Sequence, residues 1–500
     1  MRAKSKREIA FKINIYRIRK IIKKKWRRVL SNINSDSNNK NENNFEIEKV
    51  INYIEDNQDR FLEELKDFLR FPSVSTTTTH KKYIKDCANW LVDHFKSIGV
   101  TDVKLNEEFG NPLVLVNYIV DPAKPTLLIY GHYDVQPEDP INLWTSPPFE
   151  PVVKDGKIYA RGAADDKGQV FIHIKAVESY IKTFGSLPIN VKFIIEGEEE
   201  SGSEAIDEYV KTYTDTLKCD AVLISDTGWF APNFPTLSYA LRGIAVFEMK
   251  LTGPNRDLHS GMYGGAVANP LIELSKIISG LFDKDGKITV PGLYDNVLPI
   301  TQAEKVELAK LPFDRTEYME DLNIGGEGGE KEYSIVEKVW MRPSLDINGL
   351  FGGYTEEGHK SIIPSIATAK ISIRLVPNQT FAEINEKFRK YIESQIPESM
   401  KLSLKVHHGA NPVLVNVDNE YIKKAQISLK NAFNVEAGFT REGGSIPIVE
   451  LFSNHLKVPV VLMGFGLDSD NIHSPNENFV LSNFFGGIKA ISYYFKELAN

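Results

Sequence analysis

The stretch TLLIYGHYDVQP, residues 126–137, joins a short apolar run to a loop that contains a histidine and an aspartate. The run at 126–130 predicts a buried strand, because it is short, apolar and followed by turn residues. A histidine at the end of such a strand, His132, can bind a metal ion through one ring nitrogen, and Asp134 can orient the ring. Taken alone, the stretch fits a loop with a hydrogen-bonded histidine and an N-capping aspartate equally well.

Segments on both sides of this strand alternate between strand-like and helix-like patterns. Apolar runs at 113–119 and 191–195 predict strands, and apolar residues at helical spacing predict helices at 83–98 and 169–183. Such alternation is typical of an α/β domain with a mostly parallel sheet. In these sheets the active site lies beyond the carboxyl ends of the strands.

Four further motifs place acids or a histidine at or near predicted strand ends. Each alone has an ordinary explanation, such as a capping turn or a solvated acidic turn. Together they supply nitrogen and oxygen donors, which suit two zinc or similar divalent ions that share a bridging carboxylate. The residues are Asp165 in YARGAADDKG (159–168), Glu199 and Glu200 in IIEGEEESGS (194–203), Asp226 in AVLISD (221–226) and His473 in GFGLDSDNIHSPNE (464–477).

With these motifs in order along residues 46–500, the chain resembles the M20 family of metallopeptidases, and within it the carnosinase-like, cytosolic nonspecific dipeptidase branch. The resemblance implies a di-zinc aminopeptidase-like catalytic domain, α/β with a mostly parallel sheet, and an inserted α+β lid and dimerisation domain. It implies two Zn²⁺ per subunit, with Mn²⁺ or Co²⁺ as alternatives. The implied ligands are His132 and Asp226 for one ion, Glu200 and His473 for the other, and Asp165 as the bridge.

The resemblance also implies catalytic roles. Two cations lower the pKa of a bridging water so that hydroxide forms near neutral pH. Glu199 would be the general base that takes the proton and later delivers it to the leaving amine, and Asp134 would be the partner of His132. His259, in DLHSG (257–261), corresponds to a histidine that stabilises the oxyanion in the partner subunit of a homodimer. Without the resemblance, a histidine in a Gly-rich turn is the simpler interpretation.

Residues 239–409 resemble the family's lid and dimerisation domain, with the catalytic domain formed by 45–238 and 410–500. Arg374 stands where the family binds the C-terminal carboxylate of the substrate, a task that suits a bidentate guanidinium. A surface arginine on a strand is the alternative. The resemblance further implies substrate contacts from the hydroxyls of Ser361 and Ser445.

The first 44 residues differ from the rest of the chain. Residues 1–30 contain 13 Lys and Arg against Glu8 alone, while the whole chain carries a net charge of −7. Their apolar residues recur at helical spacing, which predicts a basic amphipathic helix. Such a helix can lie on an anionic membrane surface, touch nucleic acid or act as an organelle-targeting segment. A solvated basic tail without a specific partner is the alternative. Residues 31–44 are rich in Asn and Ser and predict a flexible linker.

Composition indicates a cytoplasmic protein. Cys87 and Cys219 are too few and too far apart for a disulfide framework, and no run of 18 apolar residues exists. We expect a homodimeric di-zinc peptidase acting on dipeptides or very short peptides with a free carboxyl end, and no nucleic-acid partner. The alternatives are an M20 amidohydrolase acting on N-acyl amino acids, and a non-catalytic metal-binding protein tethered by its basic leader, which would be expected to lack Glu199.

Overall fold

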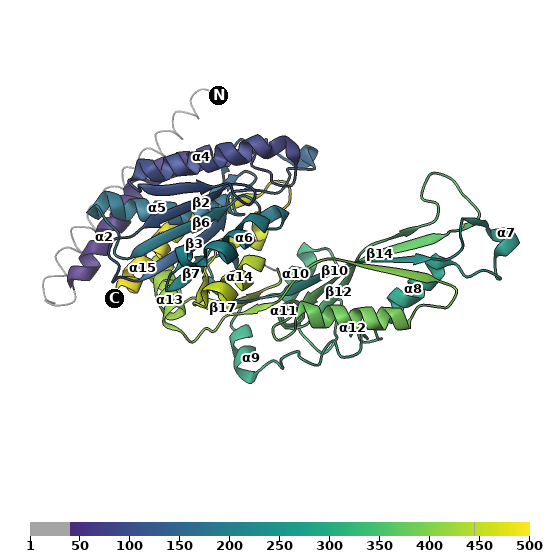
Figure 1. Cartoon of the computed structure of the whole chain (residues 1–500). Coiled ribbons are helices and arrows are strands. Elements are labelled where there is room, and N and C mark those ends of the chain that lie inside the picture. The colour runs from purple at the N-terminus through teal and green to yellow at the C-terminus, as the bar shows by residue number, and fades with distance from the viewer. Residues whose placement is uncertain (1–40, 445) are drawn as a thin grey trace, which may run out of the picture.

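The strand predicted from residues 126–130 lies at the centre of the larger sheet. A computed structural model describes residues 41–444 and 446–500, so the expected basic helix in 1–30, residues 31–40 of the expected linker and the predicted substrate residue Ser445 lie outside the described residues (Figure 1). Residues 41–44 were expected in that linker but instead begin helix α2 (Asn41–Asp56). Four neighbouring strands run parallel in this sheet, which confirms the expected parallel centre. In spatial order they are β6 (Asn190–Glu196), β3 (Thr126–His132), β7 (Ala221–Ile224) and β18 (Val460–Leu462).

The edges of this sheet are mixed rather than parallel. Strands β1 (Asp102–Asn106) and β2 (Leu113–Tyr118) pair antiparallel, because the six residues 107–112 between them are too few for a crossover. On the other side, β9 (Thr236–Leu241) pairs antiparallel with β18 and with β16 (Val413–Leu414). A further strand, β17 (Gly438–Glu442), runs parallel to β9.

Helices cover both faces of the larger sheet, which explains why its central strands are continuously apolar. Leu127 and Ile129 of β3 belong to the core on one face, and Leu128 and Tyr130 belong to the core on the other. The first core also takes residues from α2 (Asn41–Asp56), α3 (Gln58–Leu69), α4 (Lys81–Ile98), α5 (Lys167–Phe184), α13 (Glu420–Phe433) and α15 (Leu481–Ala499). The second takes residues from α6 (Glu204–Tyr213) and α14 (Pro447–Leu456).

A second, smaller part extends away from this body in Figure 1. Its antiparallel sheet has a core of its own, in which Phe247, Ile371 and Phe388 are buried. In spatial order its strands are β12 (Ser344–Gly352), β14 (Ile366–Leu375), β10 (Gly243–Thr252) and β15 (Lys401–Ala410). Helices α8 (Pro270–Gly280) and α12 (Phe381–Ser394) contribute to this core.

The chain crosses between the two parts twice. It passes from β9 into β10 through Arg242, and it returns from β15 to β16 through residues 411–412. The two crossings lie side by side, because β10 pairs with β15 and β9 pairs with β16. Across residues 41–444 and 446–500, no helix combines the length and apolar character that crossing a membrane requires.

Candidate metal centre

All five predicted metal ligands come together in two overlapping groups, three of them at the carboxyl ends of the parallel strands and Asp165 and His473 on other loops. Donor atoms of His132, Asp165 and Asp226 lie within 4.8 Å of one another, and so do those of Asp165, Glu200 and His473. His132 is the last residue of β3, Asp226 follows β7, and Glu200 lies in the short helix η3 (Glu199–Ser201) after β6. Asp165 belongs to both groups, in the position of a bridging carboxylate.

The two carboxylate oxygens of Asp165 face different histidines. Oδ1 lies 3.0 Å from His132 Nε2, and Oδ2 lies 2.9 Å from His473 Nε2. Burial raises the pKa of Asp165, but hydrogen bonds with both histidines outweigh it and hold that pKa below its usual range. His473 Nε2 is also 3.3 Å from Glu200 Oε1, so His473 contacts two acidic side chains.

Asp134 fixes the orientation of His132. The Nδ1 atom of His132 is 3.0 Å from the carbonyl oxygen of Asp134. Because a carbonyl can only accept, Nδ1 donates its proton there, which leaves Nε2, facing Asp165, as the ring nitrogen that a metal ion can bind. This is the tautomer that a metal ligand needs.

The side chain of Asp134 has a second task that the sequence did not reveal. It is fully buried, and its two oxygens accept the backbone N–H groups of Glu199 at 3.2 Å and of Glu200 at 3.1 Å. Asp134 therefore orients the histidine at the end of β3 through its backbone carbonyl, and it fixes the start of η3 after β6 through its carboxylate.

Several acidic side chains lie close together in this site, and their mutual repulsion favours the binding of positive ions. Burial raises the pKa of Glu199 to about 9, with further contributions from Asp226, Glu200 and Asp165. Burial and the neighbouring Asp165 raise the pKa of Asp226 to about 7. Divalent cations would stabilise these groups in their ionised form, and the nitrogen and oxygen donors suit zinc. The residues present therefore fit a pair of metal ions.

Glu477 is a supporting residue that sequence reasoning missed. It is fully buried and accepts a hydrogen bond from Nη1 of Arg161 at 2.9 Å. The same carboxylate accepts backbone N–H groups from Gly162, Ala164 and Asp165, at 2.9–3.1 Å. It thereby fixes the loop that presents Asp165. The available signal was its position four residues after His473, in a motif already singled out.

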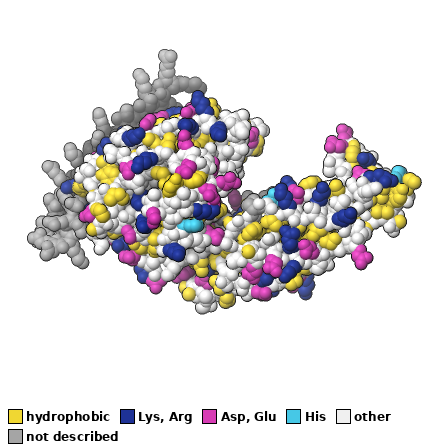
Figure 2. All heavy atoms as spheres, in the orientation of Figure 1, with side chains coloured by type: hydrophobic (Ala, Val, Ile, Leu, Met, Phe, Trp, Pro, Cys, Tyr) yellow, Lys and Arg dark blue, Asp and Glu magenta, His cyan; other side chains and the backbone are white. Residues whose placement is uncertain are grey.

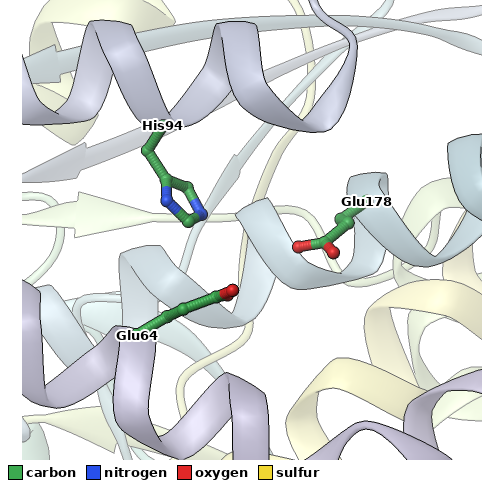
Figure 3. A group of neighbouring side chains, drawn as sticks. All are labelled: Glu64, His94 and Glu178. Carbon is green, nitrogen blue, oxygen red and sulfur yellow. The ribbon is translucent and has the colours of Figure 1, made fainter.

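A third group with metal-like spacing, Glu64, His94 and Glu178, lies among α3, α4 and α5 (Figure 3). The fully buried amine of Lys175 already occupies this group, 2.6 Å from Glu178 and 2.9 Å from His94, and it also pairs with Glu64. Burial and the charge of Lys175 lower the pKa of His94 to about 3. A metal ion would be repelled by this ammonium, so the group is a salt-bridge network.

The predicted substrate residues lie at opposite ends of the smaller part. Arg374 is next to Leu375, which pairs with Gly243 at the crossing between the two parts. His259 and Ser361 lie together at the other end of the ten-residue strand β14, which spans about 33 Å. There β11 (Leu258–His259) pairs with β13 (Ile362–Ile363), and Ser260 N–H donates to the Ser361 carbonyl at 3.0 Å.

His259 is therefore not close to the metal centre of its own chain. Helix α7 (Ser260–Tyr263), which follows it directly, marks the far tip of the smaller part in Figure 1. The ring of His259 is exposed, and its Nδ1 accepts the N–H of Gly261 at 3.0 Å. The proton is then on Nε2, so the exposed ring nitrogen is a hydrogen-bond donor.

Comparison with known proteins agrees with this geometry. Residues 128–497 match peptidase family M20/M25/M40. The Cys-Gly metallodipeptidase DUG1 of Candida albicans is 34% identical over 471 residues, which cover 90% of this chain and 96% of that protein. The Beta-Ala-His dipeptidase of Homo sapiens is 32% identical over 470 residues, which cover 91% of this chain and 93% of that protein.

Solved structures show the same relationship. The di-peptidase Dug1p from Saccharomyces cerevisiae superposes with a TM-score of 0.78 at 31% identity, covering 91% of this chain and 98% of that one. Human carnosine dipeptidase 1 gives the same TM-score, identity and coverage. The resemblance inferred from the five motifs is confirmed, and the chain belongs to peptidase family M20/M25/M40.

Proposed function

We propose that this chain is a metal-dependent dipeptidase that hydrolyses dipeptides or very short peptides with a free C-terminal carboxylate. The observation that carries the proposal is the placement of Asp165 between two histidines, with one oxygen toward each. The relatives named above, a Cys-Gly metallodipeptidase and a Beta-Ala-His dipeptidase, support the substrate class.

The proposed cofactor is a pair of Zn²⁺ ions, with Mn²⁺ or Co²⁺ as substitutes. His132 and Asp226 would hold one ion, Glu200 and His473 the other, and Asp165 would contact both. When bound, such ions polarise a substrate carbonyl and lower the pKa of a water molecule. The protein's part is to hold these donors in place, which Asp134 and Glu477 do through the contacts described above.

Glu199 is the proposed general base. It is adjacent to the ligand Glu200 and lies among Asp226, Asp165 and His132 in the buried site. A carboxylate there can accept the proton of the attacking water and return it to the leaving amine. The presence of this residue argues against a purely metal-storing protein.

We also propose that the active unit is a homodimer in which His259 serves the metal centre of the second copy. Support comes from the tip of the smaller part, where apolar side chains gather on the surface in Figure 2. Met262 is 75% exposed and Ile272 is 53% exposed. Strand β12 is an edge of its sheet and exposes Leu350 and Phe351, an arrangement that favours pairing with another chain.

The carboxyl end of the substrate is assigned to Arg374, with Ser445 as a further contact and with Ser361, which lies beside His259, contributed like that histidine by the second copy. Arg374 lies at the end of β14 nearest the crossing to the larger part. A cytoplasmic location is proposed as well. Cys87 and Cys219 are both free, which agrees with a reducing compartment.

The test is hydrolysis of a dipeptide panel beside matched N-acetyl amino acids, with metal-free and zinc-reconstituted protein. Zinc-dependent cleavage of dipeptides alone is the expected result. Cleavage of the acylated compounds instead would keep the metal centre and transfer the chain to the amidohydrolases of the family. Absence of turnover on both panels, with two zinc ions bound, would contradict an enzymatic function.

A further inference from the structure

An ion pair joins the two parts of the molecule, in addition to the two chain crossings. Arg441 lies on β17 of the larger sheet, and Glu304 lies on helix α9 (Gln302–Leu308). Figure 1 shows α9 beside the junction of the two parts. The guanidinium of Arg441 forms an ion pair with the carboxylate of Glu304 across this junction.

Both partners of this ion pair are held firmly. Arg441 Nε donates to the hydroxyl of Tyr239 at 2.8 Å, and the guanidinium lies over the Tyr239 ring, 5.0 Å from its centre. The second oxygen of Glu304 accepts from the backbone N–H and the hydroxyl of Thr301, each at 2.8 Å. The ion pair therefore has little freedom to rearrange at either end.

The surroundings make the ion pair strong. The side chain of Arg441 is 8% exposed and that of Glu304 is 23% exposed. Both line a cavity of about 730 Å³ whose walls include Leu298, Met341 and Leu414, from both parts of the molecule. In such a setting, removing one partner leaves the other charge buried and unpaired, which is costly.

The Glu304 side of the ion pair is anchored to the smaller part. The amide of Asn296 donates to both oxygens of Glu383 on α12, at 2.9 and 2.8 Å. The carbonyl of Asn296 accepts from the amide of Asn378 at 3.0 Å. The segment that leads to Glu304 is thus hydrogen-bonded to the smaller part.

The Arg441 side leads directly into a loop after β17 that begins with Gly443 and Gly444. Within that loop, Arg242 Nε donates to the Gly443 carbonyl and Arg242 N–H donates to the Gly444 carbonyl, each at 3.0 Å. Arg242 itself belongs to the crossing into β10. The loop is therefore tied to the smaller part at both of its described ends, by Arg441 through Glu304 and by Arg242.

We infer that Arg441 is a positioning residue for substrate binding. Its ion pair with Glu304 sets how the smaller part, and with it Arg374, lies relative to the larger part, and so how tightly the carboxyl end of the substrate is held. The inference rests on the proposed function, because it takes Arg374 as a substrate contact. Arg441 acts through the junction of the two parts and does not itself touch the reacting atoms.

The test compares Arg441→Met, Glu304→Gln and the double variant with the native protein. Each single variant is expected to raise KM by about tenfold, the equivalent of about 1.4 kcal/mol, with kcat within about twofold and zinc content unchanged. The double variant is expected to have a lower KM than either single variant, because it leaves no buried charge unpaired. Arg441→Lys keeps the charge and is expected to recover part of the affinity.

The smaller part offers a matched control. Arg342 forms a two-pronged ion pair with Glu330, with both contacts at 2.9 Å, and these side chains are 12% and 6% exposed. Both residues belong to the smaller part and neither is among the lining residues of the junction cavity, so Arg342→Met removes a similarly buried pair while leaving the Arg441–Glu304 contact in place. This variant is expected to lower Tm and to leave KM unchanged.

The outcome separates this inference from the proposed function. KM is measured on whichever substrate class the native protein cleaves, and an unchanged KM in both single variants would overturn the role of Arg441. So would an equal rise in KM for Arg342→Met. If the native protein cleaves neither class, small-angle scattering of the zinc-loaded proteins decides. An altered curve for Arg441→Met but not Arg342→Met then supports the connection, and identical curves reject it.

Discussion

Asp134 accepts the backbone N–H of Glu199 at 3.2 Å, although 65 residues separate them in the chain. The same carboxylate accepts the N–H of Glu200 at 3.1 Å, and the Asp134 backbone orients His132. Asp134 thus orients the proposed ligand His132 through its backbone, and it positions the proposed base Glu199 and the proposed ligand Glu200 through its buried side chain.

Asp134→Asn should therefore impair both metal binding and turnover. An asparagine side chain offers one acceptor oxygen, so either Glu199 or Glu200 would lose its backbone hydrogen bond and face an amide donor. We expect zinc affinity to fall by about 10- to 100-fold, as for other partners of metal-binding histidines, and kcat to fall with it. Zinc competition with a chelator and steady-state kinetics at saturating zinc measure the two effects.

The control for this change is Asp93→Asn, an equivalent substitution at an exposed position on α4. It should leave zinc affinity and kcat at native values. Native zinc affinity in Asp134→Asn would show that its backbone contacts alone suffice to orient His132.

Glu199→Gln should separate catalysis from metal binding. Glutamine has the same shape but cannot take a proton, and Glu199 is not among the five proposed ligands. We expect two zinc ions per chain to remain bound and turnover to fall by about 10²- to 10⁴-fold. Metal analysis and kinetics on the same preparation provide the measurement.

The neighbour Glu198 supplies a matched control for Glu199. Its oxygens accept the backbone N–H groups of Asn111 at 2.7 Å and Ala205 at 3.0 Å, so its role is structural. Glu198→Gln should lower Tm with little change in kcat. Substantial activity in Glu199→Gln would remove Glu199 from the role of base.

The positions of the ligands could be predicted because each depends on a local pattern. An apolar run followed by His132, Glu200 or Asp226 marks a strand and the point where it ends. The contacts among these ends could not be predicted in the same way. Glu477 accepts the backbone N–H of Asp165 from more than 300 residues away, and the residues next to Glu477 in the sequence do not indicate this contact.

The same distinction applies to the fold. The parallel centre of the sheet could be predicted from alternating strands and helices. The antiparallel edges could not, because they depend on loop lengths and on which strands become neighbours in the folded sheet. The Arg441–Glu304 ion pair joins residues 137 positions apart in the chain, one on β17 of the larger sheet and the other on α9. Such pairings are decided by tertiary packing, which a single sequence does not display.

The metal-free protein should lose stability as pH rises. Burial raises the pKa of Asp226 to about 7 and that of Glu199 to about 9, while hydrogen bonds to Asp165 and Glu200 raise that of His473 to about 10. In an unfolded chain these groups titrate near 3.9, 4.3 and 6.5. Between pH 5 and 9 the folded state therefore holds more protons than the unfolded state, so the free energy of unfolding falls with rising pH.

We expect Tm of the metal-free protein to drop by at least about 5 °C from pH 6 to pH 9. Asp165, whose pKa is lowered, acts in the opposite direction but titrates below this window. Zinc-loaded protein is the control, and its Tm should rise over the same range because binding requires deprotonated ligands. A metal-free Tm that increases with pH would show that these groups are arranged differently without metal.

The distance between His259 and the metal centre of its own chain leads to a complementation experiment. His259→Asn and Glu199→Gln should each be nearly inactive as homodimers. In a mixed dimer, the chain with His259→Asn keeps Glu199 and receives an intact His259 from the other copy, so one of the two sites is complete. Random pairing makes half of the dimers mixed, and co-expression should therefore restore about 25% of native activity.

If His259 acted within its own chain, neither site of the mixed dimer would be complete and no activity would return. Exchange of copies must be verified independently, by recovering both variants through an affinity tag carried by one of them. Mixed dimers recovered in this way but lacking activity would contradict the proposed role of His259. Restored activity would explain why the exposed tip of the smaller part carries a histidine whose free ring nitrogen is a donor.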